Sequence, residues 1–131
     1  MLAVDTNVVV RYLTGDDPEQ FAQAVDIVEG NDIFVSLTVL LETEWVLRSV
    51  YRFVPVQIAR VLRAFAGLPL VTVEKAHSVS LALQWTERGL DFADALHLAQ
   101  AQNFGAFITF DRDLVQRAAG LSPLPVRLPV S

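Results

Sequence analysis

Acidic side chains in this sequence stand at positions where a fold of alternating strands and helices could gather them. They are Asp5, Glu42, Asp94, Asp111 and Asp113. Asp5 and Asp111 each directly follow a short apolar segment that we expect to be a strand, and Asp113 lies two residues further on. Because ligands bind beyond the carboxyl ends of parallel strands, we expect these three carboxylates to share one edge of a sheet.

Carboxylates gathered at one edge repel one another unless a cation or a proton neutralises them. Ligand sets made only of oxygen favour Mg²⁺ or Mn²⁺. Such ions polarise phosphodiesters and activate water, so no histidine or serine nucleophile is needed. Hydrolysis of nucleic acid is therefore the leading hypothesis, although metal-dependent phosphatases and isomerases also use acidic clusters.

The two glutamates of the segment LETEW call for different interpretations. Glu44 has Arg48 one turn later, which is the favourable order for a solvated helical pair, so we expect Glu44 to be a surface charge. Glu42 lacks such a partner and has apolar neighbours such as Trp45 one turn away. Asp94 lies in a similar apolar setting. We therefore expect Glu42 and Asp94 to be partly buried carboxylates that share a cation.

The same aspartates have a simpler interpretation as helix caps. Asp5, Asp91 and Asp111 each precede a predicted helix and could accept hydrogen bonds from its first backbone N–H groups. Asp91 and Asp94 also have the spacing of a capping box. Caps are far commoner than metal ligands, so position alone leaves both interpretations open for each aspartate.

Helical periodicity and apolar segments alternate along the chain. Predicted helices cover residues 6–13, 18–29, 38–52, 55–66, 74–88, 91–104 and 112–119. Predicted strands cover residues 2–4, 33–35, 70–73, 107–110 and 126–128. The strand segments are mostly apolar without alternation, which indicates a parallel sheet covered by helices on both faces.

Composition limits the class of protein. The chain has 131 residues, no cysteine, 53% hydrophobic residues and a net charge of −5. We expect a single domain over residues 1–131, without disulfides or cysteine-bound zinc. Its apolar runs fall short of the roughly 18 residues that span a bilayer, and its start does not resemble a secretory signal, so we expect a cytoplasmic protein with no membrane partner.

Four segments carry these acidic residues, namely VDTNVVVRYL, SLTVLLETEWVLRSVY, GLDFADALHLAQA and ITFDRDL. In this order they resemble the motifs of PIN-domain ribonucleases, in particular the VapC-type toxins of bacterial and archaeal toxin–antitoxin pairs. The resemblance extends from Met1 to about Leu114, and the tail after Gly120 carries no motif that can be matched.

The resemblance implies a fold and a site. The fold would be a PIN-like three-layer α/β/α sandwich with a central parallel sheet of four to five strands. The protein would be an endoribonuclease that uses Mg²⁺ or Mn²⁺, cuts RNA and is inhibited by a cognate antitoxin protein. The implied catalytic and metal-binding acids are Asp5, Glu42, Asp94 and Asp111, with Asp113 as a further metal ligand and Thr6, Asn7 and Thr109 as polar residues that support the site.

Further contacts are predicted from the residues around these motifs. Arg11, Arg48 and Arg112 lie close enough to the motifs to reach an RNA backbone, although each could instead form a salt bridge. The apolar stripe in residues 54–66 is broad enough to be core or to bind a partner. From this stripe we expect a homodimer, because two-fold pairing is the commonest assembly.

Other classes fit less well. A response-regulator receiver needs two acids after its first strand and a lysine after its fifth, whereas the only lysine here is Lys75. A haloacid-dehalogenase-type phosphatase would have a second aspartate at the position of Asn7. The remaining alternative is a catalytically idle PIN-like module that binds RNA or protein, in which four repelling carboxylates would only cost stability.

Overall fold

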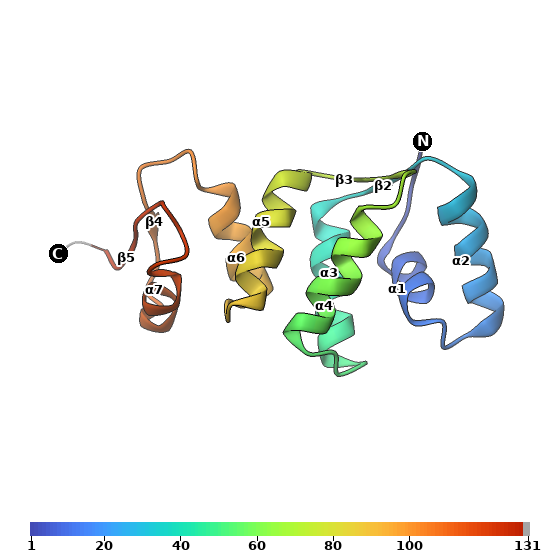
Figure 1. Cartoon of the computed structure of the whole chain (residues 1–131), viewed down its shortest axis with the longest axis horizontal. Coiled ribbons are helices and arrows are strands. Elements are labelled where there is room, and N and C mark those ends of the chain that lie inside the picture. Colours follow the sequence, from blue (N-terminus) through green and yellow to red (C-terminus); the bar gives the residue numbers. More distant parts are fainter. Residues whose placement is uncertain (130–131) are drawn as a thin grey trace. The chain divides into compact units, whose positions relative to one another are not determined.

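The computed structural model describes residues 1–129, and residues 130 and 131 of the predicted single domain lie outside the described part. The chain divides into two compact units, Met1–Ala76 and a second unit that starts at His77. The expected strands and helices occur in both units, in the expected order (Figure 1).

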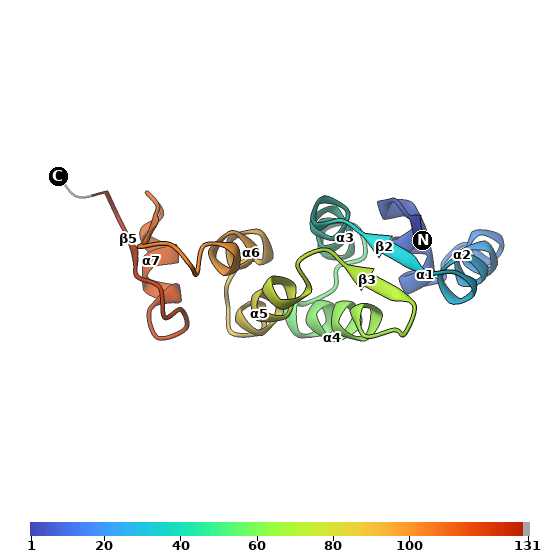
Figure 2. The same ribbon diagram turned by 90° about the horizontal axis from the view of Figure 1, so that it is seen from above.

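The first unit contains a parallel three-stranded sheet of order β1-β2-β3. Its elements in chain order are β1 (Leu2–Ala3), α1 (Thr6–Thr14), α2 (Pro18–Gly30), β2 (Ile33–Val35), α3 (Leu37–Ser49), α4 (Pro55–Ala66) and β3 (Val71–Val73). The central strand β2 pairs Ile33 with Leu2 on one side and with Val71 on the other. Helix α1 packs between α2 and α3, and α4 packs against α3 and β3 (Figure 2).

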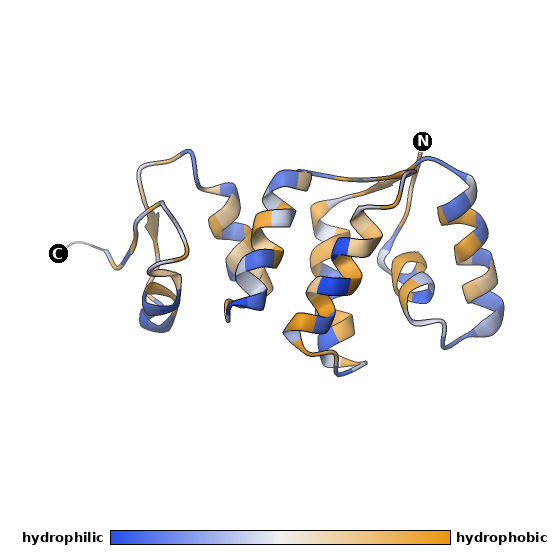
Figure 3. Cartoon of the chain, in the orientation of Figure 1, coloured by the Kyte–Doolittle hydropathy of each residue, from blue (hydrophilic) through white to orange (hydrophobic). Residues whose placement is uncertain are grey.

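Polar side chains cap the starts of α2 and α3, and apolar stripes hold the helices of this unit in place. Asp17 and Ser36 accept hydrogen bonds from the backbone at the starts of α2 and α3, and Pro18 stands in the first turn of α2. Hydrophobic and hydrophilic segments alternate along α2 and α4 (Figure 3). Burial of the apolar sides excludes water from the unit's core, which contains the fully buried Val28 and Leu62.

The second unit contains α5 (Ala76–Glu87), whose first residue belongs to the first unit, and α6 (Phe92–Gln100), β4 (Phe107–Ile108), α7 (Arg112–Ala118) and β5 (Val126–Arg127). Strands β4 and β5 form a parallel pair in which Phe107 lies opposite Val126. The proline-rich tail therefore contributes the strand that was expected at residues 126–128. Trp85, Phe92 and Leu98 are buried in this unit.

The expected α/β fold with parallel strands is confirmed, but within residues 1–129 the main sheet has three strands instead of the expected four to five. The five strands are present, but they form a three-stranded and a two-stranded parallel sheet, one in each unit. Apolar composition identifies a strand locally, whereas pairing depends on contacts between distant segments. The strands were also expected to be covered on both faces. Among the described strands, however, only β2 lacks an exposed residue, and both residues of β1 are exposed.

The apolar stripe of residues 54–66 forms part of the core. Ile58, Leu62 and Phe65 are at most 1% exposed. Val54 and Val56, at the start of α4, are 58% and 52% exposed and remain on the surface. Of the two interpretations of the stripe, the core interpretation accounts for most of it, and two valines remain available to a partner.

Within residues 1–129, no helix combines the length and the apolar character needed to cross a bilayer.

Candidate functional site

Asp5 and Glu42 are linked through a threonine in the first unit. Asp5 directly precedes α1, and the next residue, Thr6, is buried and donates its hydroxyl hydrogen to a carboxylate oxygen of Glu42 in a short hydrogen bond. This contact joins residues 36 positions apart in sequence. Thr6 therefore orients Glu42.

Two aspartates of the predicted site are helix caps. The Oδ1 atom of Asp5 accepts from the N–H of Val8 at 3.2 Å. The Oδ1 atom of Asp111 accepts from the N–H groups of Asp113 and Leu114 at 3.0 and 3.1 Å. The capping interpretation is confirmed for both aspartates, and for Asp91, which caps α6.

The caps occupy one oxygen of each carboxylate. Within the described residues, the Oδ2 atoms of Asp5 and Asp111 have no hydrogen-bond partner, nor does the Oε2 atom of Glu42. All three side chains belong to exposed residues. Each can therefore offer an oxygen to a cation while it keeps its structural hydrogen bond, so capping and metal binding do not exclude each other.

The burial expected for the two glutamates of α3 is reversed. Glu44 is only 3% exposed and pairs with Arg48, whose Nε atom lies 2.9 Å from Oε2 of Glu44. Glu42 is exposed. The i,i+4 pairing was correctly predicted, but the Glu44 side chain is buried while the side chain of its partner Arg48 stays 44% exposed. What favours Glu42 as a ligand is its accessibility and its contact with Thr6, and not its burial.

The carboxyl group of Asp94, in the second unit, has a raised pKa. Its partial burial raises the pKa of its carboxyl group, and the negative charges of Asp91 and Asp111 raise it further, against a smaller lowering effect of His97. A carboxylate held near two others in this way gains from a neutralising cation. Asp113 instead forms an exposed ion pair, with its Oδ2 atom 2.6 Å from Nε of Arg117.

The predicted supporting residues and arginines differ in their contacts. The hydroxyl of Thr109 accepts from the backbone N–H of Asp111 at 3.0 Å and so fixes the turn that carries this aspartate. Asn7 is exposed in the first turn of α1. Arg11 and Arg48 form salt bridges, whereas Arg112 is exposed and has no ion pair within residues 1–129.

The donor set fits a hard divalent cation in its chemistry, since it consists of carboxylate oxygens alone. Within residues 1–129, however, neither unit by itself gathers three or more acidic, histidine or cysteine side chains around one point. Asp5 and Glu42 come together in the first unit, and Asp94 and Asp111 interact in the second. Each unit thus contains one pair of the predicted acids, and we call each pair a half-set.

A polar network around Arg11 was not predicted. The Nε atom of Arg11 donates to Gln20, and Nη1 donates to Asp16 and to the hydroxyl of Tyr51. Tyr51 in turn donates to Asp16 at 2.7 Å. The i,i+5 spacing of Arg11 and Asp16 gave a weak local signal, but no sequence pattern indicated a partner 40 residues away.

Comparison with known proteins gives one match. Residues 2–120 match the PIN domain family. Among curated proteins, no relative was found. PIN domains are generally nucleases, which hydrolyse phosphodiester bonds, and they typically use divalent metal ions. The match covers every residue of both half-sets.

The glutamate pair of α3 gives a test of stability. Glu44→Gln should lower the free energy of unfolding by about 1–2 kcal/mol, because it removes a charge-assisted hydrogen bond from a buried site. Glu42→Gln should change it by less than about 0.5 kcal/mol, because the exposed amide oxygen can still accept from Thr6. Urea unfolding measures both. Equal effects would contradict the burial described here.

The raised pKa of Asp94 gives a test by pH. Since the folded state holds this proton more tightly than the unfolded state, its stabilising effect is present below the ordinary carboxyl pKa and is lost as pH rises through the raised value. Thermal unfolding in EDTA should therefore show Asp94→Asn gaining stability relative to the wild type between about pH 3 and pH 7. The gain should be about 0.5 kcal/mol or less, given solvent screening. A constant difference across this range would contradict the raised pKa.

Proposed function

The chain belongs to the PIN domain family, and on this premise we propose that it is a metal-dependent endoribonuclease, the toxin of a VapC-type toxin–antitoxin pair. It would act in the cytoplasm and cut RNA with Mg²⁺ or Mn²⁺. The observation that carries the proposal is that a capping aspartate in each unit keeps one carboxylate oxygen without a hydrogen-bond partner among residues 1–129.

The proposed ligands are the four acids of the two half-sets acting together, with Asp113 as an additional ligand. They are Asp5, Glu42, Asp94 and Asp111. The raised pKa of Asp94 supports this assignment, because a carboxylate that is costly to ionise alone is stabilised by a bound cation. To bind the cation, Asp113 would have to give up its exposed ion pair with Arg117. An exposed pair of this kind is a weak interaction in water.

The protein's own groups would prepare the site for catalysis. A bound Mg²⁺ or Mn²⁺ would polarise the phosphodiester and lower the pKa of a water molecule. Thr6 keeps Glu42 in position, and Thr109 fixes the turn that carries Asp111 before α7. Glu42 and Asp111 are therefore oriented before substrate arrives. Arg112 carries a side chain suited to a phosphate of the RNA.

The idle PIN-like module is the competing proposal. It would keep the same acids without using them. The caps would then account for Asp5 and Asp111, but the raised pKa of Asp94 would remain an uncompensated cost. Cleavage activity separates the two proposals directly.

We also propose a cognate antitoxin and a homodimer as protein partners. The antitoxin follows from the VapC-type resemblance. The exposed Val54 and Val56 on α4 support a small apolar contact for either partner. Light scattering that shows a monomer at high micromolar concentration would contradict the homodimer.

Metal removal and one substitution test the nuclease. The purified protein should cleave single-stranded RNA with Mg²⁺ or Mn²⁺ and lose this activity in excess EDTA. Asp5→Asn should keep the fold, because the amide oxygen can still cap α1, but it should lower cleavage by about 100-fold or more, since the first charged ligand is lost. Cleavage that persists in EDTA would rule out the metal-dependent mechanism.

The control is Asp17→Asn, which changes a capping aspartate that is not among the proposed ligands, at the start of α2. It should cleave at a rate within about twofold of the wild type, because asparagine caps as well as aspartate does. Equal losses in both variants would show that Asp5 acts through folding alone.

A further inference from the structure

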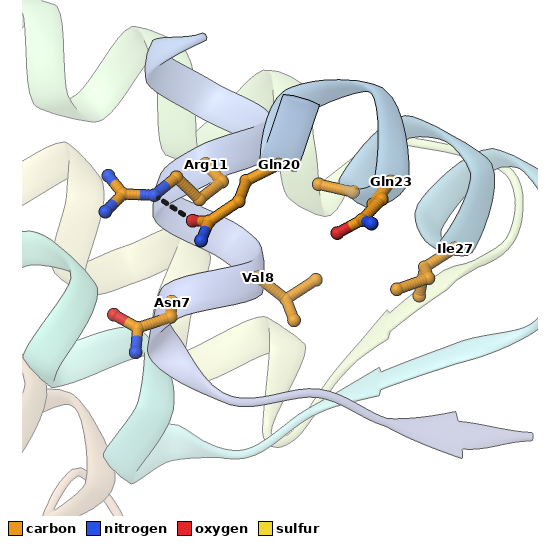
Figure 4. Close-up of a pocket in the computed structure, with 7 residues that line it drawn as sticks. Asn7, Val8, Arg11, Gln20, Gln23 and Ile27 are labelled. Atoms are coloured by element: carbon orange, nitrogen blue, oxygen red, sulfur yellow. Dashed lines mark hydrogen bonds between the residues drawn. The ribbon is translucent and has the colours of Figure 1, made fainter. Parts of the chain in front are cut away.

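A cavity of about 320 Å³ lies between α1 and α2 in the first unit. We call it the amide pocket, because three of its lining residues carry side-chain amides (Figure 4). It is lined by Asn7, Val8, Arg11, Gln20, Gln23, Ala24 and Ile27. Its volume is at the small end of the range for ligand sites, which suits one small planar group and not a folded element.

Arg11 is fixed at this pocket before any ligand binds. Its Nε atom donates to Gln20 at 2.7 Å, and Nη1 donates to Asp16 and Tyr51 at 3.3 and 3.2 Å. The hydrogen bond from Tyr51 lowers the pKa of Asp16, which keeps this carboxylate charged beside the guanidinium. Within residues 1–129, the Nη2 atom of Arg11 has no hydrogen-bond partner, so two N–H donors of a fixed guanidinium remain for an anion.

Two amide side chains of the pocket also lack hydrogen-bond partners in the described part of the chain, namely those of Asn7 and Gln23. An amide presents a donor and an acceptor together, which matches the edge of a nucleobase. Val8 and Ile27 add apolar surface to the same cavity (Figure 4). Amides for the edge of a ring and aliphatic groups for its face are what recognition of a base requires.

The pocket begins next to the proposed metal ligands. Asn7 is two residues after Asp5, in the first turn of α1, and Arg11 lies one turn further along the same helix. A nucleotide in the pocket would therefore be close to the nucleotide whose phosphate reacts. Helix α1 thus connects the acidic cap to the amide pocket.

We propose that the amide pocket binds one nucleotide of single-stranded RNA beside the scissile phosphate. Gln23 reads the edge of the base, Asn7 contacts the nucleotide at the end of the pocket nearest Asp5 in sequence, and the Nη2 atom of Arg11 binds a phosphate. Because the base must leave any duplex to enter a cavity of this kind, the substrate is single-stranded at this position. The proposal rests on the proposed ribonuclease function and adds a residue-level source of its sequence preference.

Binding of short RNA tests the pocket without any cleavage. The probes are four trinucleotides of identical sequence except for the central base, titrated in EDTA into protein labelled with ¹⁵N. The side-chain amide signals of Gln23 and Asn7 should shift with at least one trinucleotide, and Gln23→Leu should weaken its binding by about tenfold, which is the scale of one amide–base contact. Tyr51→Phe, which frees Arg11 but leaves Gln23 unchanged, should weaken binding of all four probes to a similar degree.

The control is Gln57→Leu, which removes an exposed amide on α4 outside the pocket, together with its 3.4 Å hydrogen bond from the backbone N–H of Val54. It should bind each trinucleotide within about twofold of the wild type. A cleavage assay on a randomised single-stranded RNA with Mn²⁺ completes the test, and Gln23→Leu should change the preferred base at one position while Gln57→Leu should not.

The outcomes separate the two proposals. A wild-type protein that binds the trinucleotides through Gln23 but cuts no RNA would overturn the nuclease function and leave the pocket in place. An active wild type whose base preference and trinucleotide affinity are unchanged in Gln23→Leu would overturn the pocket alone. A third outcome is that Gln23→Leu changes neither base preference nor trinucleotide affinity, while a peptide shifts the Gln23 amide signal of the wild type. This outcome would assign the pocket to a protein partner and would likewise overturn the proposal.

Discussion

The backbone N–H groups at the starts of α1 and α7 each hold one oxygen of an aspartate, and the acidic site depends on this interaction. Capping stabilises each helix by about 1 kcal/mol and places a negative charge at the positive end of the helix dipole. It uses one oxygen of each carboxylate, so the second oxygen of Asp5 and of Asp111 has no hydrogen-bond partner in the described chain. One interaction thus serves the fold and the proposed metal site.

This double use explains why capping and metal binding looked like alternatives in the sequence. Each interpretation was inferred from the same position, a polar residue between a strand and a helix. A carboxylate has two oxygens and can satisfy both, whereas a serine or threonine cap has only one oxygen and no charge. An aspartate cap alone does not identify a ligand, however, since Asp17 caps α2 without being among the proposed ligands.

Elements that depend on local contacts could be predicted from the sequence, and contacts between distant segments could not. The helices and strands occur close to the predicted ranges because apolar periodicity, prolines and capping residues act within one or two turns. Strand pairing was mispredicted because β4 pairs with β5, and apolar composition does not determine partners. The burial of Glu44 was missed because a helical pair with Arg48 has the same sequence pattern on the surface and at the edge of a core. The network of Arg11 with Tyr51 joins α1 to the segment after α3, and nothing local to either residue indicates it.

The central claim is that the four acids of the two half-sets act as one set of metal ligands. Calorimetric titration of Mn²⁺ into the wild type, Asp5→Asn, Asp94→Asn and the double variant tests it most directly. A shared set predicts that each single substitution weakens binding by about tenfold or more, and that the double variant binds little worse than either, because the substitutions are coupled through one ion. Two independent titrations, each abolished by only one of the substitutions and unaffected by the other, would contradict the claim.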